Sequence, residues 1–275
     1  MKKRSVTRWV ILYVVIIAIV VAFNLPIINA VMTSFKSNAD ISSSPPKWVF
    51  RPTLVQYNRV LFAYGYNFRL YFMNSLIISS LTSLVVLVLG IPAAYAIARY
   101  RSRINPLGLL LGLRLVPIFV FIIPIFILFT RIGQTDTRLS LILMNSVISA
   151  PLGVFLLVGF IQEIPSSIDE AARIDGASIF KILTRIIFPL SLPGVAAVVC
   201  LTFVFTWSEY LISLILSFTK AVPITVGASF FITAWEVRWG EISAAITLSV
   251  VPVFMFVYFL QNYLVRAFTG GALKG

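Results

Sequence analysis

Long apolar stretches alternate with short polar segments along this chain. Each stretch reaches or exceeds the roughly 20 residues that an α-helix needs to cross a hydrocarbon layer about 30 Å thick. We expect six spanning helices, at 10–32, 71–98, 107–129, 139–161, 190–218 and 239–264. This pattern predicts an all-α polytopic membrane protein.

Composition agrees with lipid as the solvent. Of the 275 residues, 60% are hydrophobic and 11% are charged, and the mean hydropathy is +1.01. The net charge of +13 could indicate a nucleic-acid partner. However, the Lys and Arg residues are scattered at the ends of the apolar runs, which favours anchoring by the positive-inside rule. Counted this way, both termini are predicted to be cytoplasmic.

We divide the chain into 1–70, a first helix with an external loop, and 71–275, a five-helix core. The basic start followed by an apolar run resembles a signal peptide, but the run exceeds a usual h-region and no small-x-small cleavage site follows. An uncleaved first span is therefore expected. The single Cys200 cannot form an intramolecular disulfide, and the chain has no histidine. With no metal-binding or nucleophile constellation, neither a metal, a cofactor nor a catalytic site is predicted.

The polar stretch 165–193 interrupts the apolar pattern between the fourth and fifth spans. Ser166 followed three residues later by Asp169 forms a capping-box pattern, which predicts the start of a short helix. Gly176 suits a left-handed turn after this helix. Ser178 then predicts the cap of a second helix through Ile187.

The first short helix should carry one shallow face. Ile168, Ala171, Ala172 and Asp175 fall on one side by the i, i+3, i+4 rule. Small side chains edged with acid allow a partner to approach closely. An ordinary loop that joins two spans is the alternative interpretation.

A second set of polar and aromatic residues lies inside the predicted spans. Glu209 is the carboxylate placed well inside an apolar run, so we expect it to be paired, protonated or in contact with water. Aromatic faces beside hydrogen-bonding groups suit a sugar. Structural packing, or snorkelling by the arginine, is the alternative for each residue. The candidate pathway residues are Arg114, Asn145, Trp207, Ser208, Glu209 and Tyr210.

The spacing around Glu170-Ala171-Ala172 adds a resemblance. Gly176, Ile186 and Pro189 follow Glu170 by six, sixteen and nineteen residues. This resembles the EAA motif of permease subunits in bacterial ABC importers, with Phe188 where the family usually has Leu. Other stretches resemble the carbohydrate-uptake branch that includes the smaller permease of the maltose transporter. They are 33–36 (TSFK), 45–48 (PPKW), 74–76 (NSL), 92–96 (PAAYA) and 269–275 (TGGALKG).

The resemblance implies a type I importer permease, which is not itself an enzyme. Its expected partners are a second permease, two ATPase subunits, an extracytoplasmic solute-binding protein and a carbohydrate. In that family the helices of the EAA loop dock into the ATPase and transmit its closure. Glu170 would make a polar or ionic contact, Ala171 and Ala172 would pack closely with Asp175 beside them, and Gly176 would form the bend. The chain has no G-x-x-x-x-G-K-[ST] loop for ATP.

Two further expectations accompany this reading. The polar segment 219–238 is expected to form an outer or partly re-entrant helix on which the solute-binding protein docks. The competing class is a secondary transporter or channel that works without ATP. Such proteins usually carry ion-coupling carboxylates or inverted repeats; this sequence has one candidate carboxylate, Glu209, and no convincing internal repeat.

Overall fold

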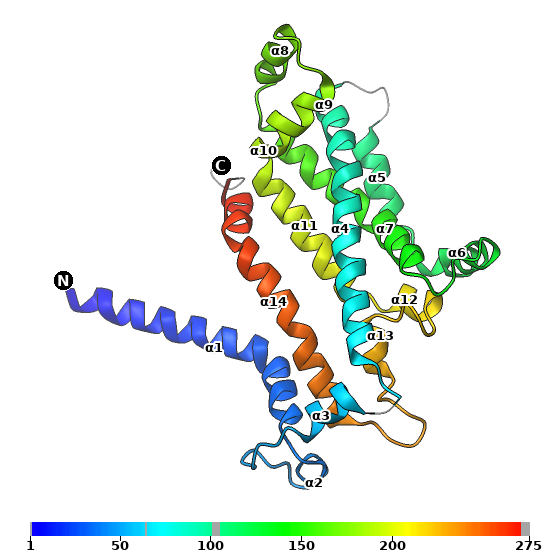
Figure 1. Cartoon of the computed structure of the whole chain (residues 1–275). Helices are drawn as coiled ribbons and strands as arrows, with labels where there is room; N and C mark the ends of the chain where they lie inside the picture. The colour runs from blue at the N-terminus through cyan, green and yellow to red at the C-terminus, as the bar shows by residue number, and fades with distance from the viewer. Residues whose placement is uncertain (1, 64, 101–104, 271–275) are drawn as a thin grey trace. The chain divides into compact units, whose positions relative to one another are not determined.

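The computed structural model describes residues 2–63, 65–100 and 105–270 (Figure 1). The basic segment 101–104 and the glycine-rich end 271–275, both used above, lie outside the described residues. No strand forms among the described residues; one isolated bridge joins Ile232 and Val237. The helices are α1 (Lys2–Ser34), α2 (Asn38–Ile41), α3 (Val55–Phe62), α4 (Phe68–Arg99), α5 (Pro106–Arg114), α6 (Phe119–Arg131), α7 (Arg138–Gln162), α8 (Ser166–Ile174), α9 (Ile179–Ile182), η1 (Leu183–Ile187), α10 (Phe188–Leu190), α11 (Leu192–Trp207), α12 (Leu211–Leu216), α13 (Ile224–Ser229) and α14 (Trp239–Gly270).

The all-helical membrane architecture is confirmed. Four helices are long and apolar enough to cross a membrane by themselves, within α1, α4, α7 and α14. The count rises to six if two bent pairs, α5 with α6 and the 179–190 segment with α11, are each one span. The predicted 107–129 span is therefore bent, by 89° between Arg114 and Phe119. Pro117 lies at this bend, where the residue before a proline is driven out of the helical region.

The chain forms two compact units, 1–68 with 228–251 and 69–227 with 252–275. The division at residue 70 made from the sequence stays a prediction. In the first unit the end of α1 is fixed by α3. The Ser34 and Tyr57 hydroxyls are 2.8 Å apart, and the ring centroids of Phe35 and Tyr57 are 5.2 Å apart. Gln56 is fully buried and donates to the carbonyl of Lys36.

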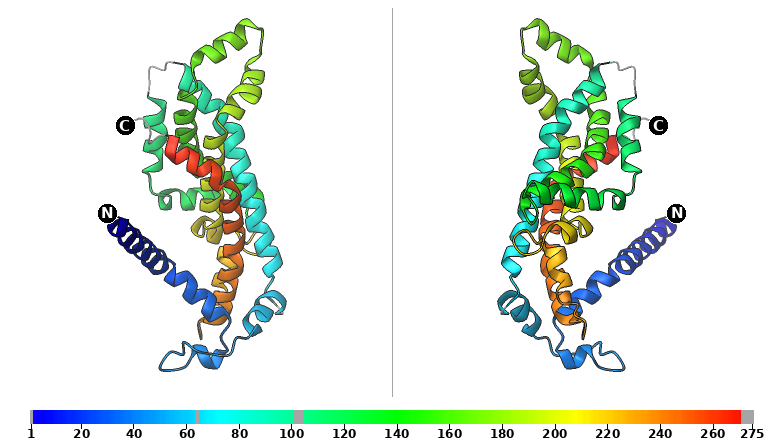
Figure 2. Two further views of the ribbon diagram at one scale, coloured as in Figure 1. Left: turned by 90° about the vertical axis from the view of Figure 1, so that its left-hand side faces the viewer. Right: turned by 90° about the vertical axis from the view of Figure 1, so that its right-hand side faces the viewer.

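The second unit is built on α4, α7 and α11, which run alongside one another (Figures 1 and 2). Gly153 explains their close approach, because a Cβ there would lie 2.8 Å from Val86 of α4 and 3.2 Å from Val198 of α11. Small residues let helix backbones come together where lipid removes the hydrophobic drive. The buried core around this crossing includes Tyr95 and Leu157.

A polar clamp closes the end of this unit where α4 begins. Asp136 accepts the backbone N–H groups of residues 218–221 and the hydroxyl of Thr219. Asn74 donates to the carbonyls of Lys220 and Val222, at 2.9 and 2.8 Å. The segment after α12 is therefore held from two directions.

Asp136 also carries a perturbed acidity. Burial raises the pKa of Asp136, but the backbone donors of Lys220, Phe218 and Ala221 and the Thr219 hydroxyl outweigh it and lower the pKa from 3.8 to about 2. The ionised carboxylate thus stabilises the fold. Because the folded-state pKa is depressed, this stabilisation is complete above about pH 4 and is lost as the pH falls through about 2.

Asp136→Asn should lower the thermal midpoint of the detergent-purified protein at pH 7 by several degrees. An amide oxygen without charge cannot replace an acceptor of this many donors, and each charge-assisted bond is worth about 1.5–3 kcal/mol. The difference from wild type should shrink as the pH approaches 2. Glu163→Gln, at an exposed carboxylate, is the control. Equal midpoints for Asp136→Asn and wild type at pH 7 would contradict this role.

Candidate coupling and pathway sites

The central polar stretch folds as two short helices with a bend, as the sequence predicts. The first is α8, and the second begins at Ile179 and continues through η1 and α10. Gly176 has a φ of +78°, in the left-handed region that favours glycine. The hydroxyl of Ser178 accepts from the N–H of Lys181 and caps the second helix.

The predicted capping box at the start of α8 is wrong. Pro165 occupies the N-cap position, and no side chain caps the helix there. Asp169 instead turns inward and is 3% exposed. Its Oδ2 is 2.5 Å from Nε of Arg99, so the tertiary ion pair takes the carboxylate away from local capping.

α8 is bound to α4 by charged and polar side chains. Besides its ion pair with Asp169, Arg99 donates to the carbonyl of Ile164 at 2.8 Å. Arg173 donates to the hydroxyls of Tyr95 at 3.1 Å and Tyr100 at 2.8 Å. These contacts were not predicted, since nothing local in the sequence shows which acid or hydroxyl Arg99 and Arg173 meet.

The residues of the EAA pattern remain accessible on the other side of α8. Glu170, Ala171 and Asp175 are exposed, and Ala172 is half-buried against the core of the second unit. Ile168 is 38% exposed. Of the two later motif positions, Ile186 is half-buried and Pro189 is exposed. The structure thus brings Glu170, Ala171 and Asp175 onto one open surface, whereas Ile186 contributes to packing.

The fifth span is shorter than the predicted 190–218. α11 ends at Trp207, and the chain turns before α12 begins at Leu211. Glu209 accounts for the break: its carboxylate accepts the N–H groups of Ile212 and Ser213, at 2.7 and 3.0 Å, and the Ser213 hydroxyl. Hydrogen bonding to a helix start was not among the outcomes expected for this carboxylate, which were pairing, protonation and contact with water.

The neighbours of Glu209 have mainly local partners. Trp207 is 5% exposed, and its ring stacks on Phe203 with centroids 5.6 Å apart and meets Phe72 edge-on at 5.8 Å. Ser208 donates to a carbonyl of its own helix, at Val204. Tyr210 remains 37% exposed. In this arrangement the Trp207 ring already has aromatic neighbours, and a sugar contact by this group stays a prediction.

Arg114 lies apart from the Trp207 group and lines a small cavity. It ends α5 and is exposed. A small cavity of about 80 Å³ is lined by Arg114 together with Ser149 of α7 and Thr202 and Phe205 of α11. The cavity therefore combines a cation, two hydroxyls and a ring.

Asn145, the remaining candidate pathway residue, is buried and donates to the carbonyl of Leu141 in its own helix.

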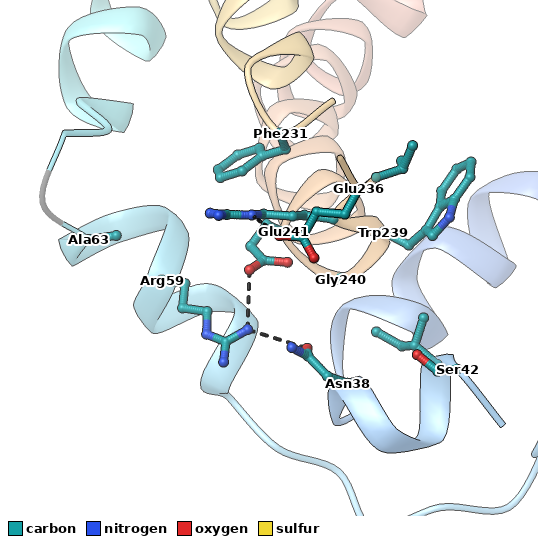
Figure 3. Close-up of a pocket in the computed structure, with 12 residues that line it drawn as sticks. Asn38, Ser42, Arg59, Ala63, Phe231, Glu236, Trp239, Gly240 and Glu241 are labelled. Carbon is teal, nitrogen blue, oxygen red and sulfur yellow. Dashed lines mark hydrogen bonds and ion pairs between the residues drawn. The ribbon is translucent and has the colours of Figure 1, made fainter. Parts of the chain in front are cut away.

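The first unit contains a larger polar pocket of about 510 Å³ (Figure 3). Arg59 Nη1 is 3.2 Å from Oε1 of buried Glu241 and 3.3 Å from Oδ1 of Asn38. Arg238 Nε is 2.9 Å from Oε1 of Glu236. The two cations thus face two anions, and the pocket offers both donors and acceptors. It was not predicted, because its residues are far apart in the sequence.

Comparisons with known proteins agree with this architecture. A family model described as "Binding-protein-dependent transport system inner membrane component" matches residues 87–270. The chain belongs to this family. It is the membrane-spanning permease component of an ATP-binding-cassette importer.

Relatives of this permease extend the match along the chain. It is 32% identical over 245 residues to "Probable ABC transporter permease protein y4oR" of Sinorhizobium fredii, covering 89% of this chain and 88% of that protein. It is 32% identical over 265 residues to "Trehalose/maltose transport system permease protein MalG" of Thermococcus litoralis, covering 95% and 94%.

A solved structure shows the same fold. It is a chain of a "bacterial ABC transporter involved in the import of the acidic polysaccharide alginate", with a TM-score of 0.73 and 23% identity over 96% of this chain and 99% of that one. The fold of this permease is therefore that of an importer subunit.

Gly176→Ala should destabilise the bend after α8. A left-handed residue with a Cβ costs roughly 1–2 kcal/mol, and no atom lies within 4 Å of the added Cβ, so the cost is conformational. The matched control is Gly159→Ala in α7, where the Cβ also meets open space but the backbone is helical. Limited proteolysis at 165–190 and thermal midpoints should separate the two variants. Identical behaviour of the pair would contradict the assigned role of the bend.

Proposed function

We propose that this permease imports a carbohydrate, works beside a second permease, and is driven by two ATPase subunits that bind at α8. The observation that carries the proposal is the exposed Glu170, Ala171 and Asp175 surface on a helix fixed to the core. The name of the Thermococcus relative supports a sugar as the solute.

The shape and chemistry of α8 support ATPase docking. Alanine side chains leave the helix shallow, so another protein can approach its backbone, while Glu170 supplies a charge at the edge. A short helix of this kind would be mobile alone, yet the Arg99 and Arg173 contacts fix it to α4. A fixed, exposed helix can transmit force in either direction.

The orientation follows from this proposal. With α8 on the cytoplasmic side, both termini would be cytoplasmic, in keeping with the positive-inside prediction. The pocket residues Arg59, Glu236, Arg238 and Glu241 supply balanced charge for polar recognition. We propose that the solute-binding protein docks on the 219–238 segment, as the sequence predicted, where Glu236 and Arg238 line this pocket.

Arg114 is the pathway residue that the cavities favour. A guanidinium with five fixed donors beside two hydroxyls and a phenyl ring matches the hydroxyls and C–H faces of a sugar. Carrying this charge at the middle of a membrane costs about 2.5–3.5 kcal/mol on insertion scales.

Glu170→Lys should abolish recovery of the ATPase with the permease and reduce uptake at least about tenfold, as expected for reversal of an interface charge. Glu163→Lys makes the same reversal at an exposed carboxylate outside α8 and should keep both properties. Co-purification of tagged complexes and uptake into proteoliposomes provide the measurements. Normal ATPase recovery with Glu170→Lys would refute docking at α8.

Arg114→Gln should lower the uptake of a radiolabelled sugar about tenfold, on the order of one lost charge-assisted hydrogen bond, without changing ATPase recovery. Arg131→Gln is the matched control, because Arg131 ends α6 as an exposed cation. Screening maltose, trehalose and raffinose against an amino acid identifies the solute class. Uptake of the amino acid alone would remove the carbohydrate assignment, and equal effects of the two arginine variants would remove Arg114 from the pathway.

A further inference from the structure

The strongest polar connection of α8 to the rest of its unit is the Arg99 and Asp169 ion pair. The Arg99 side chain is 10% exposed and that of Asp169 is 4% exposed. Arg99 is the last residue of α4, and Asp169 lies in the first turn of α8. Among the described residues, side-chain hydrogen bonds from α8 run to α4 or to Tyr100, which follows it.

We propose that the Arg99 and Asp169 ion pair is the joint through which a displacement of α8 moves α4. The proposal rests on ATPase docking at α8 and adds the residues that carry the motion onward. Both act as positioning residues, since neither is exposed enough to touch the ATPase or the solute.

Burial makes this joint resistant to slipping. A buried charge that loses its partner keeps its full desolvation cost, so the two helices separate only at a large penalty. Asp169 has an added constraint: its Oδ1 is buried and has no hydrogen-bond partner among the described residues. The carboxylate therefore depends on Arg99 for its compensation. Arg99 also holds Ile164 through its Nη2, so α8 and the end of the segment preceding it move with the same guanidinium.

The chain around α8 transmits force less well than the ion pair. Pro165 precedes the helix without a side-chain cap, and Gly176 follows it in a left-handed turn with open space around it. Arg173 donates to the hydroxyls of Tyr95 and Tyr100, and a neutral hydroxyl binds a cation less strongly than a carboxylate does. The ion pair is therefore the stiffest polar link between α8 and the spanning helices.

α4 then connects this joint with the opposite end of the unit. It is a single helix of 32 residues, about 48 Å long at 1.5 Å per residue. Near its start, Asn74 bonds the carbonyls of Lys220 and Val222, and Ser75 accepts the N–H of Ile224. Figure 1 shows α8 beside the last turns of α4 and α13 beside the first. Movement of α8 would reach the segment after α12 through one continuous helix, which contains Pro92 between the two contacts.

The test is a double-mutant cycle in proteoliposomes that contain the complete importer. Arg99→Gln, Asp169→Asn and the double variant are compared for ATPase recovery, ATP hydrolysis and sugar uptake. Each single variant should lower uptake per ATP about tenfold while hydrolysis continues, within the range of measured coupling between sites. The double variant should resemble the singles to within about threefold, because the two residues act through each other. Glu163→Gln, at an exposed carboxylate, should keep the wild-type ratio.

The outcomes separate the two proposals. If uptake and hydrolysis fall together in step with ATPase recovery, the pair is merely structural and the inference is overturned. If the losses of uptake per ATP in the two single variants multiply in the double variant, the inference is overturned as well. If a single variant fails to assemble, the double variant decides, because it leaves no unpaired buried charge. A wild-type ratio of uptake to ATP hydrolysis in the double variant would contradict the inference. Failure of ATPase docking itself is seen separately, as normal ATPase recovery with Glu170→Lys.

Discussion

Lipid supplies no hydrogen bonds, so every break in a spanning helix must be closed by the protein itself. This constraint accounts for most of the polar side chains in the second unit. Glu209 accepts the N–H groups that begin α12, Asp136 accepts those of 218–221, and Asn74 binds the carbonyls that follow. Polar residues that look like solute ligands in a one-dimensional reading are thus first of all the means by which the chain turns inside or beside a membrane.

The same constraint separates the proposed ATPase-docking helix from the proposed solute path. α8 lies outside the apolar spans, so its Glu170 and Asp175 can stay in water while Asp169 is compensated by Arg99. Arg114 and its cavity lie among α5, α7 and α11. The 32-residue helix α4 contacts both α8 and the opposite clamp. One helix can therefore relate two sites that share no residue.

Hydrophobic periodicity sufficed for the helices because a run of about 20 apolar residues has few alternatives in lipid. Glycine at 176 and serine at 178 were equally readable, since each acts on its own backbone. Two of the failures are tertiary, whereas the bend at Pro117 and the break at Glu209 have local causes. Ser166 and Asp169 satisfy a local capping pattern, yet a cation 70 residues earlier takes the acid. The pocket around Arg59 and Glu241 joins groups 182 residues apart, and no local rule finds such a pair.

The break at Ser208 changes how the fifth span should be understood. An apolar run that continued to 218 would have placed Glu209 deep in a helix, where a carboxylate needs a counter-ion or a proton. The end of α11 at Trp207 supplies neither a counter-ion nor a proton. It does let the Glu209 carboxylate accept the N–H groups of Ile212 and Ser213 in α12, at 2.7 and 3.0 Å. Those donors meet the demand that made Glu209 look functional. Arg114, for which no such local hydrogen bond is found among the described residues, is then the candidate pathway residue whose chemistry is still open to a solute.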